Sequence, residues 1–216
     1  MVGANTRFAH LLSRPGFYTS GYTTPAQHPH TGHLHLQDGL RPATRTADAT
    51  VWRELFSPPH ALNFGIGGDA TQHVLWRLSN GELDNISPKV VVLWVGTNNH
   101  GHTAEQICEG ILAIVQVIKN KLPHANTLVL GLLPRGKLPN RLRERNAQVN
   151  QLVEEALSSL PHASFLNVDS GFVHSDGSIS HRDMYDYLHL TPQAYQDVCQ
   201  PIHAHLKSLL EKPAGN

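Results

Sequence analysis

An aspartate and a histidine near the carboxyl end give the sequence its clearest chemical signal. Asp186 and His189 stand three positions apart, within the run Asp-Met-Tyr-Asp-Tyr-Leu-His-Leu at residues 183–190. An aspartate so placed can accept the Nδ1 proton of the histidine and leave Nε2 free as a general base. A structural histidine capped by a nearby aspartate has the same pattern, so this spacing alone leaves both interpretations open.

A glycine-rich turn is the second candidate. The run Gly-Ile-Gly-Gly-Asp-Ala at residues 65–70 follows a short apolar segment. Glycines let the backbone approach a ligand and leave amide hydrogens pointing at it. The run also fits a loose dinucleotide-binding fingerprint, which requires an acidic residue at the end of the next strand. The next apolar run ends in Val-Gly-Thr-Asn at 95–98, so the sequence disfavours nucleotide binding.

An asparagine is the third candidate, because Asn98 follows the apolar run at residues 90–95. Its side-chain N–H can donate to a negative charge that develops on an oxygen. Apolar runs at 61–64, 90–95, 127–133 and 164–168 predict strands, and they alternate with segments of helical periodicity. That order predicts an α/β fold with a parallel sheet, whose sites gather at the carboxyl ends of its strands.

Helix boundaries can be read from capping residues and prolines. Asp69 with Gln72, and Thr103 with Gln106, predict the starts of two helices. A third helix is predicted over about 142–160, and a long loop over about 170–190. The last helix is predicted to start at Thr191-Pro192 and to bend or split at Pro201.

Composition excludes several classes of protein. The 216 residues fit one domain, and Lys plus Arg equals Asp plus Glu at 17 each. This balance argues against nucleic acid or an acidic membrane as the main partner. No apolar run approaches the ~20 residues that span a bilayer. The two cysteines, Cys108 and Cys199, are expected to be buried thiols of a cytoplasmic protein.

The chain changes character near residue 50. Residues 1–50 are rich in His, Pro, Gly and Thr and are predicted to form a disordered leader, followed by a domain at 51–212 and a tail at 213–216. The His-rich tract at 28–35 could bind zinc or copper, although a flexible tail without a ligand is the favoured interpretation. The apolar patches at 8–12 and 33–36 lack the flanks expected of a buried strand.

Several longer segments resemble a known family. Residues 52–58, 61–69, 94–100, 131–136 and 171–177 closely resemble the catalytic α subunits of the platelet-activating-factor acetylhydrolases, which are SGNH (GDSL-like) hydrolases. Residues 101–106 and 183–190 are most similar to the α1 type. The resemblance covers roughly residues 51–210. It implies a flavodoxin-like three-layer α/β/α fold with strand order 2-1-3-4-5.

The resemblance also implies roles for particular residues. The Gly68 N–H and the Asn98 side chain would be oxyanion donors, His189 the general base and acid, and Asp186 the group that orients it; Thr97 and Leu188 would shape a small acyl pocket. The implied reaction is hydrolysis of an acetyl ester on a phospholipid such as platelet-activating factor, without metal or cofactor. The implied partners are a second copy or a paralogous α subunit, together with a WD40-repeat regulatory subunit.

One block of the family pattern is absent. The family's nucleophile lies in a Gly-Asp-Ser turn after an inner strand, upstream of the segment that begins at Trp52, and this sequence contains no Gly-Asp-Ser. Ser13 and Ser20 are the only serines before Trp52, and we expect no strand to precede either of them. We therefore expect the inner strand and the nucleophile to be missing, through an alternative first exon or a mispredicted start. The alternative function is a non-catalytic isoform that binds the family's partners.

Overall fold

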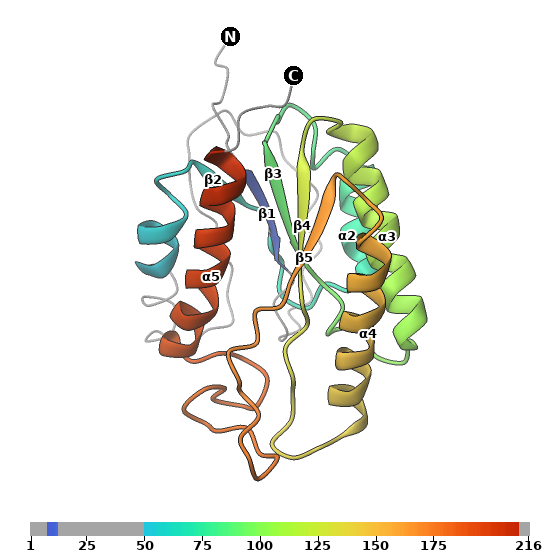
Figure 1. Ribbon diagram of the computed structural model, residues 1–216. Helices are drawn as coiled ribbons and strands as arrows, with labels where there is room; N and C mark the ends of the chain where they lie inside the picture. Colours follow the sequence, from blue (N-terminus) through green and yellow to red (C-terminus); the bar gives the residue numbers. More distant parts are fainter. Residues whose placement is uncertain (1–7, 13–49, 212–216) are drawn as a thin grey trace, which may run out of the picture.

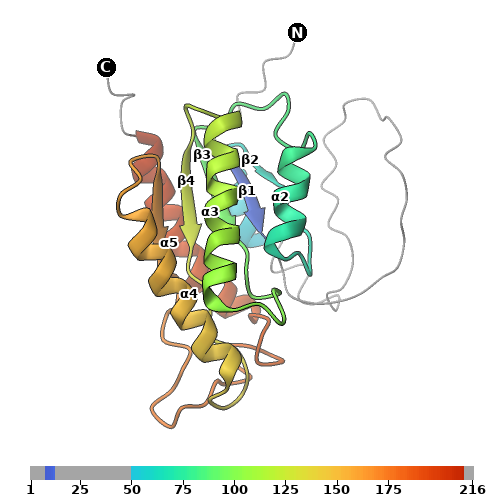
Figure 2. The same cartoon turned by 90° about the vertical axis from the view of Figure 1, so that its right-hand side faces the viewer.

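The computed structural model describes residues 8–12 and 50–211, with side chains for 50–211. Its strands form a five-stranded sheet in the order β2-β1-β3-β4-β5. Every neighbouring pair in the sheet is parallel. Figures 1 and 2 show this sheet between two layers of helices, so the predicted α/β class and strand order are confirmed.

The inner strand is present, and the expectation that it is missing is wrong. β1 (Phe8–Leu12) lies between β2 (Ala61–Asn63) and β3 (Val90–Trp94). Phe8 is in register with both Ala61 and Val90. The leader as a whole is rich in proline, which disfavours an inner strand. A strand needs only about five residues, however, and Phe8–Leu12 contains no proline. The other patch, at 33–36, lies outside the described residues.

The sheet buries both faces, which explains why its strands are nearly continuous apolar runs. Val91 and Leu93 of β3 and Val129 of β4 (Asn126–Leu130) pack in one core with α2 (Thr71–Ser79), α3 (Ala104–Lys121) and α4 (Arg141–Leu157). The alternating residues Val90, Val92 and Leu128 pack in a second core with the helical segment at 50–55 and α5 (Pro192–Glu211). β5 (Ala163–Leu166) completes the sheet beside β4.

The helix caps match the sequence in one case and differ in another. At α3 the capping box is confirmed, since the Gln106 N–H donates to Thr103 Oγ1 at 3.3 Å and the Thr103 N–H donates to Gln106 Oε1 at 3.0 Å. At α2 the predicted cap is wrong, because the N-cap residue is Ala70 rather than Asp69. Asp69 pairs instead with Arg77, which a local capping pattern cannot reveal.

Two remaining sequence expectations concern α5 and the cysteines. The expectation for α5 is a bend or a split at Pro201, and the split is wrong, because α5 is continuous from Pro192 to Glu211. Cys108 and Cys199 are buried, as expected. None of the helices over 50–211 is long and apolar enough to cross a membrane.

Candidate active site

The Asp186–His189 pair forms in the long loop before α5. His189 Nδ1 lies 2.5 Å from Asp186 Oδ2, while Asp186 Oδ1 accepts the His189 N–H at 2.7 Å and the Leu188 N–H at 3.1 Å. Burial raises the pKa of Asp186, but the hydrogen bonds from His189 and Leu188 outweigh it and leave that pKa below its usual value. A charged Asp186 holds the proton on Nδ1, which leaves His189 Nε2 available as a base.

The loop that carries this pair is anchored on both sides. Met184 and Leu190 form an isolated antiparallel bridge, and the Met184 side chain is fully buried. The Tyr185 N–H donates to the His189 carbonyl oxygen at 3.1 Å. Between these anchors Tyr187 adopts a positive φ of 63°. The chain therefore makes a tight turn that presents Asp186 and His189 together.

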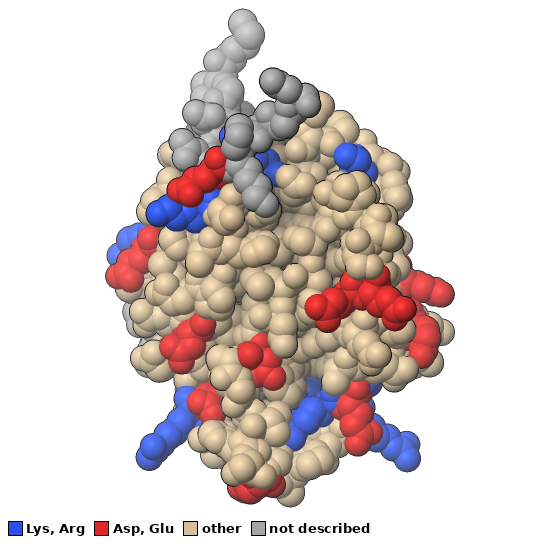
Figure 3. Space-filling view, viewed as in Figure 1, with Lys and Arg blue, Asp and Glu red and all other residues tan. Residues whose placement is uncertain are grey.

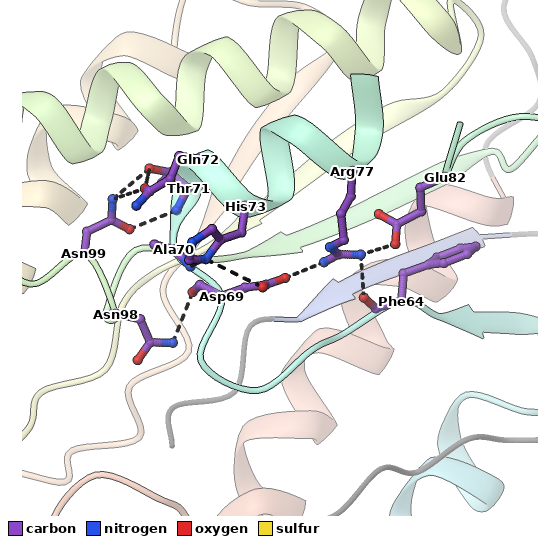
Figure 4. Close-up of polar contacts among 10 residues, drawn as sticks. All are labelled: Phe64, Asp69, Ala70, Thr71, Gln72, His73, Arg77, Glu82, Asn98 and Asn99. Atoms are coloured by element: carbon purple, nitrogen blue, oxygen red, sulfur yellow. Dashed lines mark hydrogen bonds and ion pairs between the residues drawn. The ribbon is translucent and has the colours of Figure 1, made fainter. Parts of the chain in front are cut away.

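The two predicted oxyanion donors lie beside each other. Asn98 Nδ2 donates to the Asp69 carbonyl oxygen at 3.1 Å, which sets the Asn98 carboxamide against the Gly68–Asp69 turn (Figure 4). Gly68 has a φ of +86°, and no heavy atom lies within 4 Å of the position that a Cβ would take. No described residue accepts a hydrogen bond from the Gly68 N–H. A backbone donor after β2 and a side-chain donor after β3 thus lie on either side of the end of β1.

A partly buried ion network holds the glycine turn in place. The Asp69 carboxylate pairs with Arg77 Nη2 at 2.6 Å. Arg77 Nη1 also donates to the Phe64 carbonyl oxygen at 3.1 Å and pairs with Glu82 (Figure 4). Burial raises the pKa of Glu82, and the Arg77 guanidinium lowers it to a smaller extent. These contacts join the segment after β2 to α2, so the position of Gly68 is fixed from both sides.

Asn99 is a positioning residue that sequence reasoning missed. It is 2 % exposed; its Oδ1 accepts the Thr71 N–H at 3.0 Å and its Nδ2 donates to Thr71 Oγ1 at 2.8 Å. These bonds tie the end of β3 to the first turn of α2. The signal available in the sequence was its position: Asn99 directly follows Asn98, in the turn after the apolar run at 90–95.

Arg135 contacts one of the two predicted pocket residues and lines a groove with the other. Arg135 Nη1 donates to the Thr97 carbonyl oxygen at 2.8 Å and to Thr97 Oγ1 at 3.1 Å. Arg135 also lines one groove of about 520 Å³ with Asp186 and Leu188. Burial and the nearby Arg145 lower the pKa of Arg135, whereas the Asp186 carboxylate raises it. Sequence reasoning missed this arginine, whose signal was the Pro-Arg-Gly run that follows β4.

The nucleophile cannot be placed from the described residues. Ser13 directly follows Leu12, the last residue of β1, and lies outside them. The expectation that no strand precedes this serine is wrong. The His-rich tract at 28–35 also lies outside the described residues. Within 50–211 no group of three or more His, Cys, Asp or Glu side chains is placed to hold a metal ion.

Sheet order and strand-end residues together define a class of protein. A parallel sheet ordered 2-1-3-4-5 carries a glycine turn after β2, an asparagine turn after β3 and an Asp–His pair before α5. This is the three-layer α/β/α arrangement of SGNH hydrolases. The chain matches the GDSL-like lipase/acylhydrolase family over residues 18–196, and it belongs to that family.

Within this family the chain is similar to one group of enzyme subunits. The chain is 65% identical over 165 residues to the human platelet-activating factor acetylhydrolase IB subunit alpha1, covering 76% of this chain and 71% of the relative. It is 60% identical over 162 residues to the chicken alpha2 subunit, covering 75% and 71%. These matches confirm the family resemblance seen in the sequence.

Solved structures agree on the fold. A GDSL-like lipase from Bacteroides thetaiotaomicron superposes with a TM-score of 0.66 at 15% identity, covering 98% of this chain and 90% of that one. An acetyl-xylooligosaccharide esterase from Geobacillus has a TM-score of 0.66 at 11% identity, covering 95% of each chain. Likenesses at such low identity extend to the fold alone.

Proposed function

We propose that this chain carries the base and oxyanion groups of a serine hydrolase site for acetyl esters. His189 is the general base and acid, Asp186 orients it, and the Gly68 N–H and Asn98 Nδ2 stabilise the oxyanion. The observation that carries the proposal is the 2.5 Å contact between Asp186 Oδ2 and His189 Nδ1. A charged aspartate at that distance leaves His189 Nε2 as the only basic ring nitrogen.

The chemistry follows from these positions. A serine Oγ attacks the ester carbonyl while His189 Nε2 takes its proton, and the carbonyl oxygen becomes an oxyanion. Collapse of this intermediate breaks the ester bond, and His189 returns the proton to the leaving alcohol. Water activated by His189 then releases acetate from the acyl-enzyme. A backbone and a side-chain N–H suit the oxyanion because they are held before the charge develops.

The substrate class rests on the acyl pocket and the relatives. Thr97 is held by Arg135, which lines the same groove as Leu188. We assign Thr97 and Leu188 to a pocket for a short acyl group such as acetyl. The names of the relatives point to platelet-activating factor as the acetyl ester.

A second function is favoured by one feature of the sequence, the absence of Gly-Asp-Ser anywhere in it. Without that serine the chain would not turn over esters and would act as a non-catalytic isoform. Its partners would be a second copy, a paralogous α subunit or a WD40-repeat regulatory subunit, in the cytoplasm. The relatives are named as subunits, which supports an assembly.

A minimal repair of β1 tests the proposal. Leu11→Gly with Leu12→Asp creates Gly-Asp-Ser with the existing Ser13, directly at the end of β1. The unmodified chain should neither hydrolyse a short acetyl ester above background nor react with a fluorophosphonate probe. The repaired chain should gain both properties, and Ser13→Ala in it should remove them.

The fold of each variant is checked by circular dichroism before activity is measured. A second repair replaces residues 1–50 with the corresponding segment of the alpha1 relative. If both repairs fold and neither hydrolyses the ester, the proposed site is wrong. Labelling of Ser13 in the unmodified chain would instead identify it as the nucleophile and contradict the non-catalytic alternative.

A further inference from the structure

We infer that His181 is a positioning residue that fixes the Asp186–His189 pair. The functional part of this inference rests on the proposed role of His189, but the contacts do not. His181 Nδ1 lies 2.8 Å from the Tyr185 carbonyl oxygen, and His181 Nε2 lies 2.5 Å from the Tyr187 hydroxyl. One imidazole therefore spans the residues on either side of Asp186.

The partners of His181 determine its tautomer. A carbonyl oxygen can only accept, so His181 Nδ1 must carry the proton that it donates to Tyr185. In the neutral imidazole Nε2 is then bare and accepts from the Tyr187 O–H. Both ring nitrogens are used within the loop, which leaves neither for a substrate. His181 thus acts through its neighbours rather than as a catalytic residue.

The tyrosines carry this constraint to the proposed catalytic groups. The Tyr185 ring stacks on the His189 ring with centroids 5.6 Å apart and an interplanar angle of 15°. The Tyr187 carbonyl oxygen accepts the Gly136 N–H at 2.8 Å, which joins the loop to the segment after β4. His181 therefore holds both the residue whose ring stacks on His189 and the residue whose carbonyl oxygen joins the loop to Gly136.

The loop needs such a constraint for two reasons. Tyr187 has a φ of 63°, a region that residues with a side chain rarely adopt. Asp186 is 41% exposed in its side chain, so burial alone does not define its position. A residue in that backbone region persists only when the surrounding contacts hold it there. His181 contacts the hydroxyl of the strained residue and also contacts Tyr185, two positions before it.

His174 offers a matched control in the same loop. Its Nε2 lies 3.1 Å from Asp183 Oδ2, and its side chain is 51% exposed. No contact joins its ring to Tyr185 or Tyr187 among the hydrogen bonds and ring contacts of residues 50–211. Replacing His174 therefore removes a loop histidine with an acidic partner but leaves the brace around Asp186 in place.

The variants separate the two contacts of His181. His181→Asn can keep the donor to Tyr185, His181→Gln can keep the partner of the Tyr187 hydroxyl, and His181→Ala keeps neither. Tyr187→Phe removes one oxygen and leaves the ring. The first measurement is the low-field proton NMR resonance of the His189 Nδ1–H, which requires no nucleophile. The second is kcat and KM for acetyl ester hydrolysis in the Leu11→Gly, Leu12→Asp chain.

We expect His181→Ala and Tyr187→Phe to shift or broaden the His189 resonance and to lower kcat about 10- to 100-fold with little change in KM, because small displacements of reacting groups have effects of that size. His181→Asn and His181→Gln should each retain part of the kcat that His181→Ala loses. The variant that combines His181→Ala with Tyr187→Phe should lose less kcat than the product of the two single losses, since both changes remove the contact between His181 Nε2 and the Tyr187 hydroxyl. His174→Gln should leave the resonance and kcat unchanged.

An unchanged His189 resonance in both folded His181→Ala and folded Tyr187→Phe would overturn the inference. So would an equal effect of His174→Gln. If His181→Ala does not fold, Tyr187→Phe decides alone. If both repaired chains fold and neither is active, the proposed function fails, but the NMR measurement still decides whether His181 positions the pair.

Discussion

The Asn98 side chain donates to the carbonyl oxygen of Asp69 at 3.1 Å, so a residue after β3 is held against the turn after β2. Because the Asn98 carboxamide is the proposed side-chain oxyanion donor, Asn98→Ala in the repaired chain should lower kcat by about 10²–10³. KM should change little. Steady-state kinetics measure the effect, with the exposed Asn80→Ala as control. A loss of less than about threefold would remove Asn98 from this role.

The proposed general base predicts a larger effect. His189→Ala in the repaired chain should lower kcat by several orders of magnitude, because no base remains to take the serine proton. Asp186→Asn should cost the same or less, through the wrong tautomer of His189. Single-turnover acetyl release measures both, with exposed His124→Gln as control. Full activity of the His189→Ala chain would contradict the assignment of the pair.

The lowered pKa of Asp186 predicts an effect of pH on stability. A carboxyl group whose pKa is depressed in the folded state contributes stability above its unfolded pKa, and this contribution is lost as the pH falls through the folded value. The ordinary value is 3.8. The stability difference between the chain and Asp186→Asn should therefore be constant above about pH 5 and shrink below 3.8. Urea unfolding across this range measures it, and a difference that grows on acidification would contradict the assignment.

Gly96 predicts a stability effect at the end of β3. Its φ is +134°, and a Cβ there would lie 3.0 Å from Ile107 Cγ2 and 3.1 Å from Leu132 Cδ1. Gly96→Ala should destabilise the fold by about 1–3 kcal/mol through overpacking, in addition to backbone strain. Gly101→Ala is the matched control, because its φ is +84° and its Cβ would meet nothing within 4 Å. Equal urea midpoints for the two variants would show that crowding is unimportant.

The inner position of β1 predicts that the amides of its neighbouring strands are protected from hydrogen exchange. Because β3 lies between β1 and β4, its amides should exchange slowly in the intact chain. His10→Pro removes a ladder N–H from an inner strand and should raise exchange in β2 and β3. His10→Val, which keeps the donor, should not. Hydrogen exchange with mass spectrometry distinguishes the two; equal protection in both variants would mean that Phe8–Leu12 does not support the sheet.

The strands and helices between 50 and 211 could be predicted because their signals are local. The apolar run at 90–95 and the capping box of Thr103 and Gln106 need no distant partner to be recognised. Phe8–Leu12 could not be assigned, because its neighbours in the sheet begin at residues 61 and 90. A five-residue run is ambiguous until those neighbours are known.

The same distinction applies to the candidate site. Asp186 and His189 are three residues apart, and their spacing was visible in the sequence. Arg135 contacts Thr97 from 38 positions away, and Asn99 contacts Thr71 from 28 positions away. Such contacts depend on which strand ends meet at one edge of the sheet. Composition and local spacing carry no information about them.

The inner position of β1 also makes residues 8–12 comparable to a tethered ligand. Residues 50–211 provide the two strands that receive it, and the intervening chain sets its local concentration. Occupancy of the inner position between β2 and β3 then becomes a binding equilibrium that mutations in either part can adjust.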